Sequence, residues 1–165
     1  MNYLKSKFKI IVIGLILLSP GYLFAQDMET KPVSLEEALN RASEENKKIL
    51  IDVYASWCPY CQRMHSEVYT NEEVLRALSD HYLWVKINVE SEDIVRYKGS
   101  DFTEAQFARA LENENVPTTF FMNDEGAIIG KQPGYLEPDI FSNLLNYIGS
   151  DAFLSQSFDE FRNSR

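Results

Sequence analysis

ILIDVYASWCPYC, residues 49–61, is the segment of this 165-residue chain that decides the fold. Its first six residues are apolar and rich in β-branched side chains apart from Asp52, a composition typical of a buried strand. Cys58 and Cys61 follow at the point where the strand feeds into a helix, and they are the only cysteines in the sequence. Two thiols at C-x-x-C spacing can close into a disulfide and reopen, so any redox chemistry passes through this pair.

The first 25 residues predict export. Three lysines precede an apolar core over residues 10–18, Ser19-Pro20-Gly21 breaks that core, and a cleavage site precedes Gln26. An uncleaved anchor is the alternative, although the break comes before the apolar run reaches the roughly 20 residues that span a bilayer. We therefore expect a signal peptide over 1–25, a flexible lead-in over 26–33, one domain over 34–150 and a helical tail over 151–165.

Export changes the meaning of the two cysteines. In an oxidising compartment, cysteines tend to form structural disulfides. A bridge between residues three positions apart closes a very small loop and gives little entropic stabilisation. The pair is therefore better explained as a reactive site than as a structural link.

The charge balance excludes one class of partner. Without residues 1–25 the chain carries 13 Lys and Arg against 25 Asp and Glu, a net charge of −12. A nucleic-acid-binding protein needs a basic surface to neutralise phosphates, and no basic stripe is present. We expect no nucleic-acid partner.

Helical and strand patterns alternate along the remaining sequence. Residues 91–102 are polar and are expected to form an inserted loop. Helices are expected after Ser34 and its capping box, over 59–69, after Thr70, after Thr103 and from Pro138, and strands over 48–54, 83–89, 118–122 and 127–132. Strands separated by helices, then a hairpin and a closing helix, predict an α/β domain with a central mixed sheet covered on both faces.

From about Ser34 to Gly149 the chain resembles the thioredoxin superfamily. The markers are an acid six residues before the first cysteine (Asp52), a lysine on the next strand (Lys86) and the loop Val116-Pro117-Thr118. The run M-x-x-EVY-x-N-x-EV over residues 64–74 and the insertion near Gly99 resemble the exported branch, which includes SoxW-like proteins and the C-terminal thioredoxin domain of DsbD. The resemblance implies a thioredoxin fold with an inserted loop and helix before a cis-proline.

The same resemblance implies a substrate groove beside the cysteines. Pro117 would be the cis-proline that faces the pair, and the backbone of Val116 would pair with an extended substrate segment by β-augmentation. The remaining groove residues would be Trp57, Pro59 and Tyr60. Without the resemblance, Pro117 could simply end a loop, Trp57 could pack in the core and Tyr60 could be an exposed aromatic.

The residues themselves indicate the roles of the two cysteines. A helix that starts near Pro59 places Cys58 at its N-terminus, where free backbone N–H groups favour a thiolate. Such positions lower a cysteine pKa to about 3.5–7.5. We expect Cys58 to be the exposed nucleophile and Cys61, one turn inside, to be the less exposed resolving thiol.

Asp52 and Lys86 have two interpretations. A charged residue within an apolar strand is unfavourable unless it is paired or protonated. In the functional interpretation, Asp52 is buried near Lys86 and takes the proton of Cys61 during exchange. In the structural one, Asp52 lies on the solvent-facing side of the strand, which its alternation with Ile51 and Val53 also allows.

A metal site is a weaker hypothesis. Cys58, Cys61 and His65 form C-x2-C-x3-H, but a closed zinc site needs four ligands, and His81 lies beyond another expected helix. We interpret His65 as a surface residue of its helix, and expect no metal and no cofactor beyond the cysteine pair.

These observations predict an exported, periplasmic thiol–disulfide oxidoreductase. The resemblance favours a reductant that takes electrons from a membrane thiol–disulfide carrier and passes them to exported protein disulfides. Cys58-Pro59-Tyr60-Cys61 departs from the Gly-Pro dipeptide of reducing thioredoxins, so a disulfide-forming oxidant is an alternative. A non-enzymatic metal-binding or peptide-binding module is the other.

Overall fold

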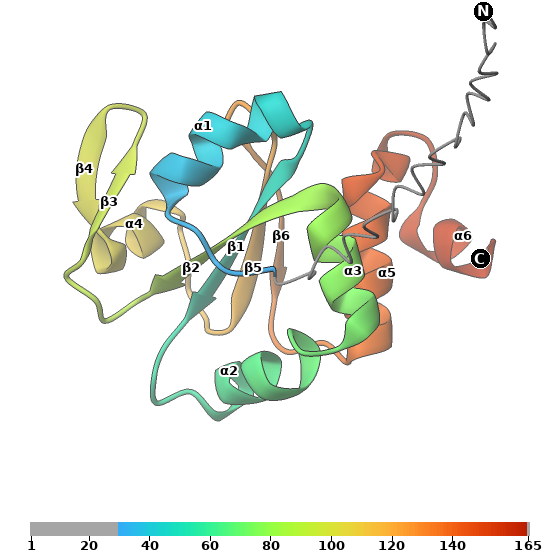
Figure 1. Cartoon of the computed structure of the whole chain (residues 1–165). Coiled ribbons are helices and arrows are strands. Elements are labelled where there is room, and N and C mark those ends of the chain that lie inside the picture. Colours follow the sequence, from blue (N-terminus) through green and yellow to red (C-terminus); the bar gives the residue numbers. More distant parts are fainter. Residues whose placement is uncertain (1–29, 165) are drawn as a thin grey trace, which may run out of the picture.

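The computed structural model describes residues 30–164, so the expected signal peptide lies outside the described residues. A four-stranded sheet in the order β2-β1-β5-β6 forms its centre (Figure 1). Its strands are β1 (Lys48–Tyr54), β2 (Tyr82–Asn88), β5 (Thr118–Met122) and β6 (Ile128–Pro133). The β1–β2 pair is parallel and the other two pairs are antiparallel. The sheet is therefore mixed, as the alternating pattern predicts.

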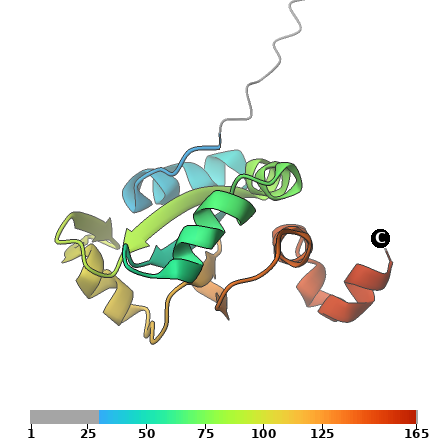
Figure 2. The ribbon, with the colours of Figure 1, turned by 90° about the horizontal axis from the view of Figure 1, so that it is seen from below.

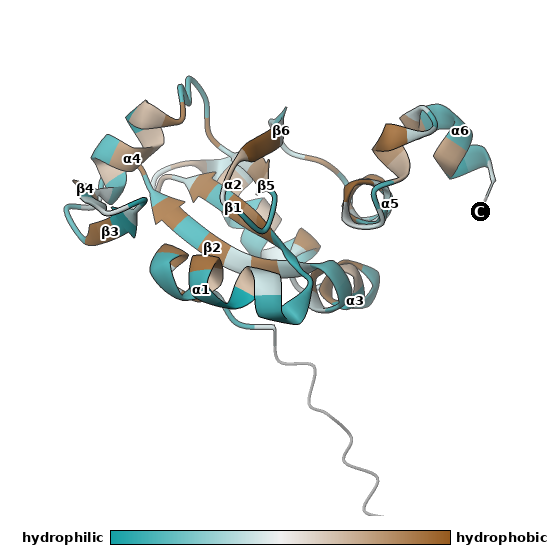
Figure 3. Ribbon diagram, turned by 90° about the horizontal axis from the view of Figure 1, so that it is seen from above, coloured by the Kyte–Doolittle hydropathy of each residue, from teal (hydrophilic) through white to brown (hydrophobic). Residues whose placement is uncertain are grey.

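Helices cover both faces of this sheet. One face carries α1 (Leu35–Glu45) and α4 (Glu104–Ala110). The other carries η1 (Met64–Val68), α3 (Glu72–His81) and α5 (Pro138–Gly149), and α2 (Pro59–Arg63) leads directly into η1. Figure 3 shows hydrophobic residues along the strands and hydrophilic ones on the outer sides of α1 and α3. Burial of apolar surface between these layers is the main source of stability.

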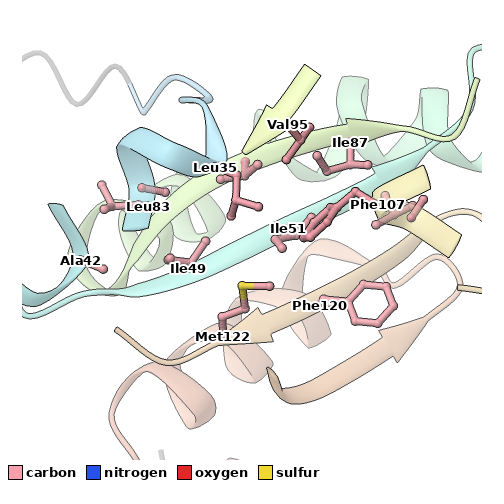
Figure 4. Close-up of a cluster of buried hydrophobic side chains, with 14 residues drawn as sticks. Leu35, Ala42, Ile49, Ile51, Leu83, Ile87, Val95, Phe107, Phe120 and Met122 are labelled. Atoms are coloured by element: carbon pink, nitrogen blue, oxygen red, sulfur yellow. The ribbon is translucent and has the colours of Figure 1, made fainter. Parts of the chain in front are cut away.

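The face beneath α1 and α4 contains a large cluster of buried hydrophobic side chains, and we call it the apolar face. Ile49, Ile51 and Val53 point into it from β1, because alternate residues of a strand share a face. They meet Leu35 and Phe107 from the two helices. Figure 4 shows Ile49 and Ile51 on the strand, with Leu35 and Phe107 packed over them.

The opposite face is rich in rings, and we call it the aromatic face. Tyr69 stacks on Trp84 with centroids 4.6 Å apart and meets Phe141 edge-on at 5.6 Å. Asp52 is fully buried on this side, between Leu50 and Tyr54 in the strand. The solvent-facing interpretation of Asp52 is therefore wrong.

The inserted segment is more ordered than the sequence predicts. Residues 91–102 were expected to form a loop, but they contain most of a hairpin of β3 (Ile94–Tyr97) and β4 (Ser100–Thr103). Val95 is buried against the apolar face, and the Tyr97 hydroxyl donates to the Gly126 carbonyl over 2.8 Å. Tertiary contacts thus stabilise a hairpin that the polar composition of the segment does not predict. Figure 1 shows it at the side of the molecule, beside α4.

Helix caps follow the sequence with two exceptions. Thr103 forms the full capping box with Gln106. Ser34 caps α1 through the Glu37 N–H, but the Glu37 side chain pairs with Arg41 instead of completing the box. The cap of α3 is Asn71 rather than Thr70, whose hydroxyl donates to the Ser66 carbonyl.

The C-terminal segment contains the short η2 (Ala152–Leu154) and α6 (Phe158–Asn163). Phe158 and Phe161 each pack on Tyr147 of α5 with ring centroids 5.4 Å apart. This places α6 against α5 at the edge of the molecule (Figure 2). Across residues 30–164, no helix has the length and apolar character needed to cross a membrane.

Candidate active site

Cys58 and Cys61 form a disulfide at the end of the β1 segment, with their Cα atoms 5.2 Å apart. Cys58 is the N-cap of α2, with an extended backbone, and Pro59 occupies the first helical turn. The Cys58 sulfur accepts a hydrogen bond from the Cys61 N–H at 3.1 Å. The strand-to-helix transition thus places Cys58 where helix N–H groups stabilise a thiolate once the disulfide opens.

Cys58 is less accessible than the sequence predicts, whereas Cys61 is buried, in line with its expected lower exposure. Cys58 is 3% exposed and Cys61 1%, so the expectation of an exposed Cys58 is wrong for the disulfide form. The reason is packing, because the pair lies against Ala55 and Val116. The neighbouring aromatic side chains are the solvent-exposed part of this segment, since Trp57 is 65% exposed and Tyr60 is 57% exposed.

The loop before Cys58 is held through Ser56. The Ser56 N–H donates to Glu90 Oε2 at 3.3 Å, and its carbonyl accepts from Gln62 Nε2 at 3.1 Å. Asn88 Nδ2 donates to the Ser56 hydroxyl at 3.4 Å. Side chains from the end of β2 and from α2 therefore fix the loop that presents Trp57.

The Val116–Pro117 peptide bond is cis, as the resemblance implies. Val116 packs against the cysteine pair, and Pro117 is buried just before β5. Among residues 30–164, no hydrogen bond to the Val116 backbone is seen. The backbone next to the disulfide is therefore open to pairing with another chain.

Asp52, His65 and Lys86 form a connected chain of side chains on the aromatic face. His65 Nε2 lies 2.6 Å from Asp52 Oδ2, and His65 Nδ1 lies 3.4 Å from Lys86 Nζ. Asp52 and Lys86 are register partners on the parallel strands β1 and β2. The interpretation of His65 as a helix surface residue is wrong, because its ring bridges the two residues expected to form the proton path.

Burial and charge shape this cluster. Burial lowers the pKa of the Lys86 ammonium, and the Asp52 carboxylate opposes that shift. Burial also raises the pKa of the Tyr69 phenol well above its ordinary value, and the Asp52 charge adds to the shift. The Lys86 ammonium lies 4.6 Å from the ring centroid of Tyr54, a cation–π contact. The Asp52 charge thus raises the pKa values of both Lys86 and Tyr69.

Two exposed side chains of α2, Tyr60 and Arg63, form a second cluster with the partly buried Tyr135. The rings of Tyr60 and Tyr135 are 6.1 Å apart, and the Arg63 guanidinium lies 4.4 Å from the Tyr135 ring centroid. Arg63 also pairs with Glu67 at 2.9 Å. Tyr135 comes from the loop before α5, so its position beside Tyr60 depends on tertiary structure.

His65 is the residue that sequence reasoning misses, although a signal for it is present. Cys61, Met64, His65 and Val68 recur at the spacing of one buried helix face. A histidine one helical turn after Cys61 therefore belongs on the side that faces the sheet. The segment is π-helical, a form often found at functional sites. Within residues 30–164, no group of three or more His, Cys, Asp or Glu side chains is arranged to hold a metal ion.

Comparison with known proteins agrees with this geometry. The model of the thioredoxin-like domain family matches residues 35–149. The thiol:disulfide interchange protein DsbD of Colwellia psychrerythraea is 24% identical over 115 residues, which cover 68% of this chain and 18% of that protein. Human spermatogenesis-associated protein 20 is 40% identical over 55 residues, 33% of this chain and 7% of that protein. The chain thus spans less than a fifth of the length of these relatives.

Solved structures share the fold. A thioredoxin-fold protein from Helicobacter pylori superposes with a TM-score of 0.64 at 18% identity, covering 82% of this chain and 84% of that one. The oxidised C-terminal domain of Neisseria meningitidis DsbD gives a TM-score of 0.52 at 17% identity, covering 69% and 96%. The matched family model, the mixed sheet and the C-x-x-C disulfide beside a cis-proline lead to one conclusion: the chain belongs to the thioredoxin-like domain family.

Proposed function

We propose that this chain is an exported thiol–disulfide oxidoreductase that reduces disulfides of exported proteins through Cys58-Pro59-Tyr60-Cys61. The observation that carries the proposal is the buried Asp52 carboxylate, bound by a histidine one helical turn after Cys61. A reductant must release its substrate by attack of the resolving thiol, and that thiol must first lose its proton. A buried carboxylate is suited to accept that proton.

The first step is attack on the substrate. The Cys58 thiolate attacks one sulfur of a protein disulfide, forms a mixed disulfide and displaces the other substrate sulfur as a thiolate. That thiolate takes a proton from solvent. The position of Cys58 at the start of α2 stabilises its thiolate before the attack.

The second step regenerates the internal disulfide. Cys61 gives its proton to Asp52 and attacks the Cys58 sulfur, so that the Cys58–Cys61 bond forms and the substrate leaves with its second sulfur reduced. Two electrons pass from the cysteine pair to the substrate, and no cofactor takes part. A membrane thiol–disulfide carrier then reduces the pair for the next cycle.

The surroundings of the pair suit a polypeptide substrate. The open backbone of Val116 offers main-chain pairing to an extended segment. Trp57 and Tyr60 are exposed on either side of Cys58 and supply large apolar contact areas. The export pattern of residues 1–25 and the relationship to DsbD support a periplasmic location for this exchange.

Insulin reduction with a small dithiol as electron donor tests the activity. We expect turnover by the wild type and none by Cys58→Ser, because the nucleophile is then absent. Tight stoichiometric binding of zinc or copper without turnover would instead support a binding module. Faster formation of disulfides in a reduced test protein than reduction of insulin would support the oxidant.

Trapping in cells tests the partners. Cys61→Ala leaves Cys58 able to attack but removes the resolving thiol, so mixed disulfides accumulate and can be identified after purification. The matched control is Cys58→Ala/Cys61→Ala, which cannot form them. We expect exported proteins and a membrane carrier among the trapped partners; recovery of a quinone-linked oxidase as the carrier would contradict the reductant.

A further inference from the structure

Three side chains from three elements meet on the aromatic face. Asp52 from β1 is 0% exposed, His65 comes from η1, and Lys86 from β2 is partly buried. The imidazole touches both neighbours, with Nε2 2.6 Å from Asp52 Oδ2 and Nδ1 3.4 Å from Lys86 Nζ. The imidazole ring therefore connects the carboxyl group of Asp52 with the amino group of Lys86.

The chemistry of the two partners fixes the position of the imidazole proton. An ionised carboxylate only accepts hydrogen bonds, and an ammonium only donates them. A neutral imidazole that carries its proton on Nε2 satisfies both, since Nε2–H donates to Asp52 and Nδ1 accepts from Lys86. An imidazolium would place an N–H against the Lys86 ammonium, two donors facing each other.

The ring is held in this orientation from several sides. Tyr54 meets it nearly edge-on with centroids 5.0 Å apart, and Tyr69 lies 5.9 Å away. The titratable or charged groups in contact with His65 are Asp52 and Tyr54 on β1, Lys86 on β2 and Tyr69 after η1. This surrounding leaves the imidazole little rotational freedom.

The Asp52 carboxylate is therefore bound asymmetrically. His65 occupies Oδ2, while Oδ1 is buried and has no hydrogen-bond partner among residues 30–164. An unpartnered buried acceptor is unfavourable in a resting structure but suits a group that receives a proton during each cycle.

We propose that His65 is a positioning residue for the resolving step: it holds Oδ2 of Asp52 so that Oδ1 accepts the Cys61 proton. This rests on the proposed role of Asp52 as the proton acceptor. The Cys61 S–H bond breaks, the Oδ1–H bond forms, and the sulfur electron pair makes the bond to Cys58 while the substrate thiolate leaves. His65 gains and loses no electrons and keeps its Nε2–H.

Reaction of the reduced protein with 5,5′-dithiobis(2-nitrobenzoate) tests the proposal in stopped flow. The Cys58 thiolate attacks the reagent and releases one coloured thiolate; Cys61 then attacks the mixed disulfide and releases the second. The first phase reports Cys58 and the second reports the resolving step. No protein substrate is needed, so failure of insulin reduction and failure of this proposal are distinguishable.

Two variants of matched size separate positioning from packing. His65→Leu fills the space without a donor, and His65→Gln keeps an N–H at the place of Nε2. We expect His65→Leu to slow the second phase about tenfold, the effect of losing one charge-assisted hydrogen bond, and to leave the first phase unchanged. His65→Gln should recover most of the rate, and His81→Gln should behave as the wild type.

Equal effects of His65→Leu and His65→Gln on the rate of the second phase would overturn the proposal, because packing alone would then explain them. The ¹⁵N spectrum of the folded wild type gives a test that no variant can obscure. We expect the Nε2 atom of His65, which faces Asp52, to carry a proton and the Nδ1 atom, which faces Lys86, to carry none; a proton on Nδ1 would overturn the assignment.

Discussion

The apolar and aromatic faces of the sheet are built from alternate residues of the same strands, yet they differ in chemistry. On β1, Ile51 points into a face with no charged side chain among its buried members. The next residue, Asp52, points into a face where an acid, a histidine and a lysine are connected. One face is therefore a hydrophobic core, and the other gives up some stability to bury the acid that we propose as the proton acceptor.

The two faces differ in how they affect the stability of the fold. A buried carboxylate is unfavourable unless it is compensated, and here one histidine donor compensates one of its oxygens. Close apolar packing on the other side supplies the stability that this site does not. Substitutions on the apolar face of β1 should therefore lower the free energy of unfolding without changing activity. Substitutions on its aromatic face should lower activity without lowering the free energy of unfolding.

The largest effect on stability is expected on the apolar face. Ile51→Ala should lower the free energy of unfolding by about 2–5 kcal/mol, because it removes buried methyl groups and leaves a cavity. Ile51→Val should lower it by about 1 kcal/mol as a graded control. Urea denaturation measures both. Activity per folded molecule should not change, and a large loss of turnover in folded Ile51→Val would contradict the division between the faces.

On the aromatic face, Asp52→Asn should have the opposite result. The rate of the resolving step should fall about 100-fold, the lower end of what a general base contributes. The free energy of unfolding should stay the same or rise, because a buried charge is replaced by a neutral group of the same shape. Stopped-flow kinetics and urea denaturation test this together. Unchanged kinetics with lower stability would mean that Asp52 is structural.

Lys86→Met should change the free energy of unfolding less than Ile51→Ala does, because the Lys86 ammonium is partly solvated. Burial lowers the pKa of Lys86 in the folded protein, so between that pKa and 10.5 the unfolded state binds more protons and stability rises with pH. At neutral pH, Lys86→Met should be more stable by less than about 1 kcal/mol. This advantage should shrink as pH approaches 10.5. Urea denaturation at a series of pH values measures it, and a constant difference would contradict the linkage.

The smallest effect is expected at the rim of the sheet. Glu104 accepts a 2.6 Å hydrogen bond from the Asn88 N–H, and burial raises the pKa of its carboxyl group. The folded state therefore keeps this proton to a higher pH than the unfolded state, and the contribution to stability is lost as pH rises above 4.5. Glu104→Gln should gain less than about 1 kcal/mol at neutral pH, with no gain below pH 4. Thermal unfolding at both pH values tests this, and an equal gain at both would contradict it.

Local patterns predict the strands and helices well where the side chains that fix them are close in sequence. Strand β1 begins and ends at Lys48 and Tyr54 as expected, because an apolar run bounded by polar residues leaves little choice. The β3–β4 hairpin was missed because its stability depends on distant partners, such as the Gly126 carbonyl that accepts from Tyr97. The exposure of Cys58 was misjudged for the same reason, since Val116 lies 58 positions further along the chain and covers it.

By itself, the sequence determined where the redox chemistry lies, because two cysteines at C-x-x-C spacing leave no other disulfide to form. It also indicated the family, through Asp52, Lys86 and Pro117. Only the tertiary structure decided which side of β1 encloses Asp52, since alternation in a strand permits either face. It also placed His65, thirteen residues beyond Asp52, between the acid and the lysine. A hydrogen bond between two elements depends on how they pack, and no local pattern contains that information.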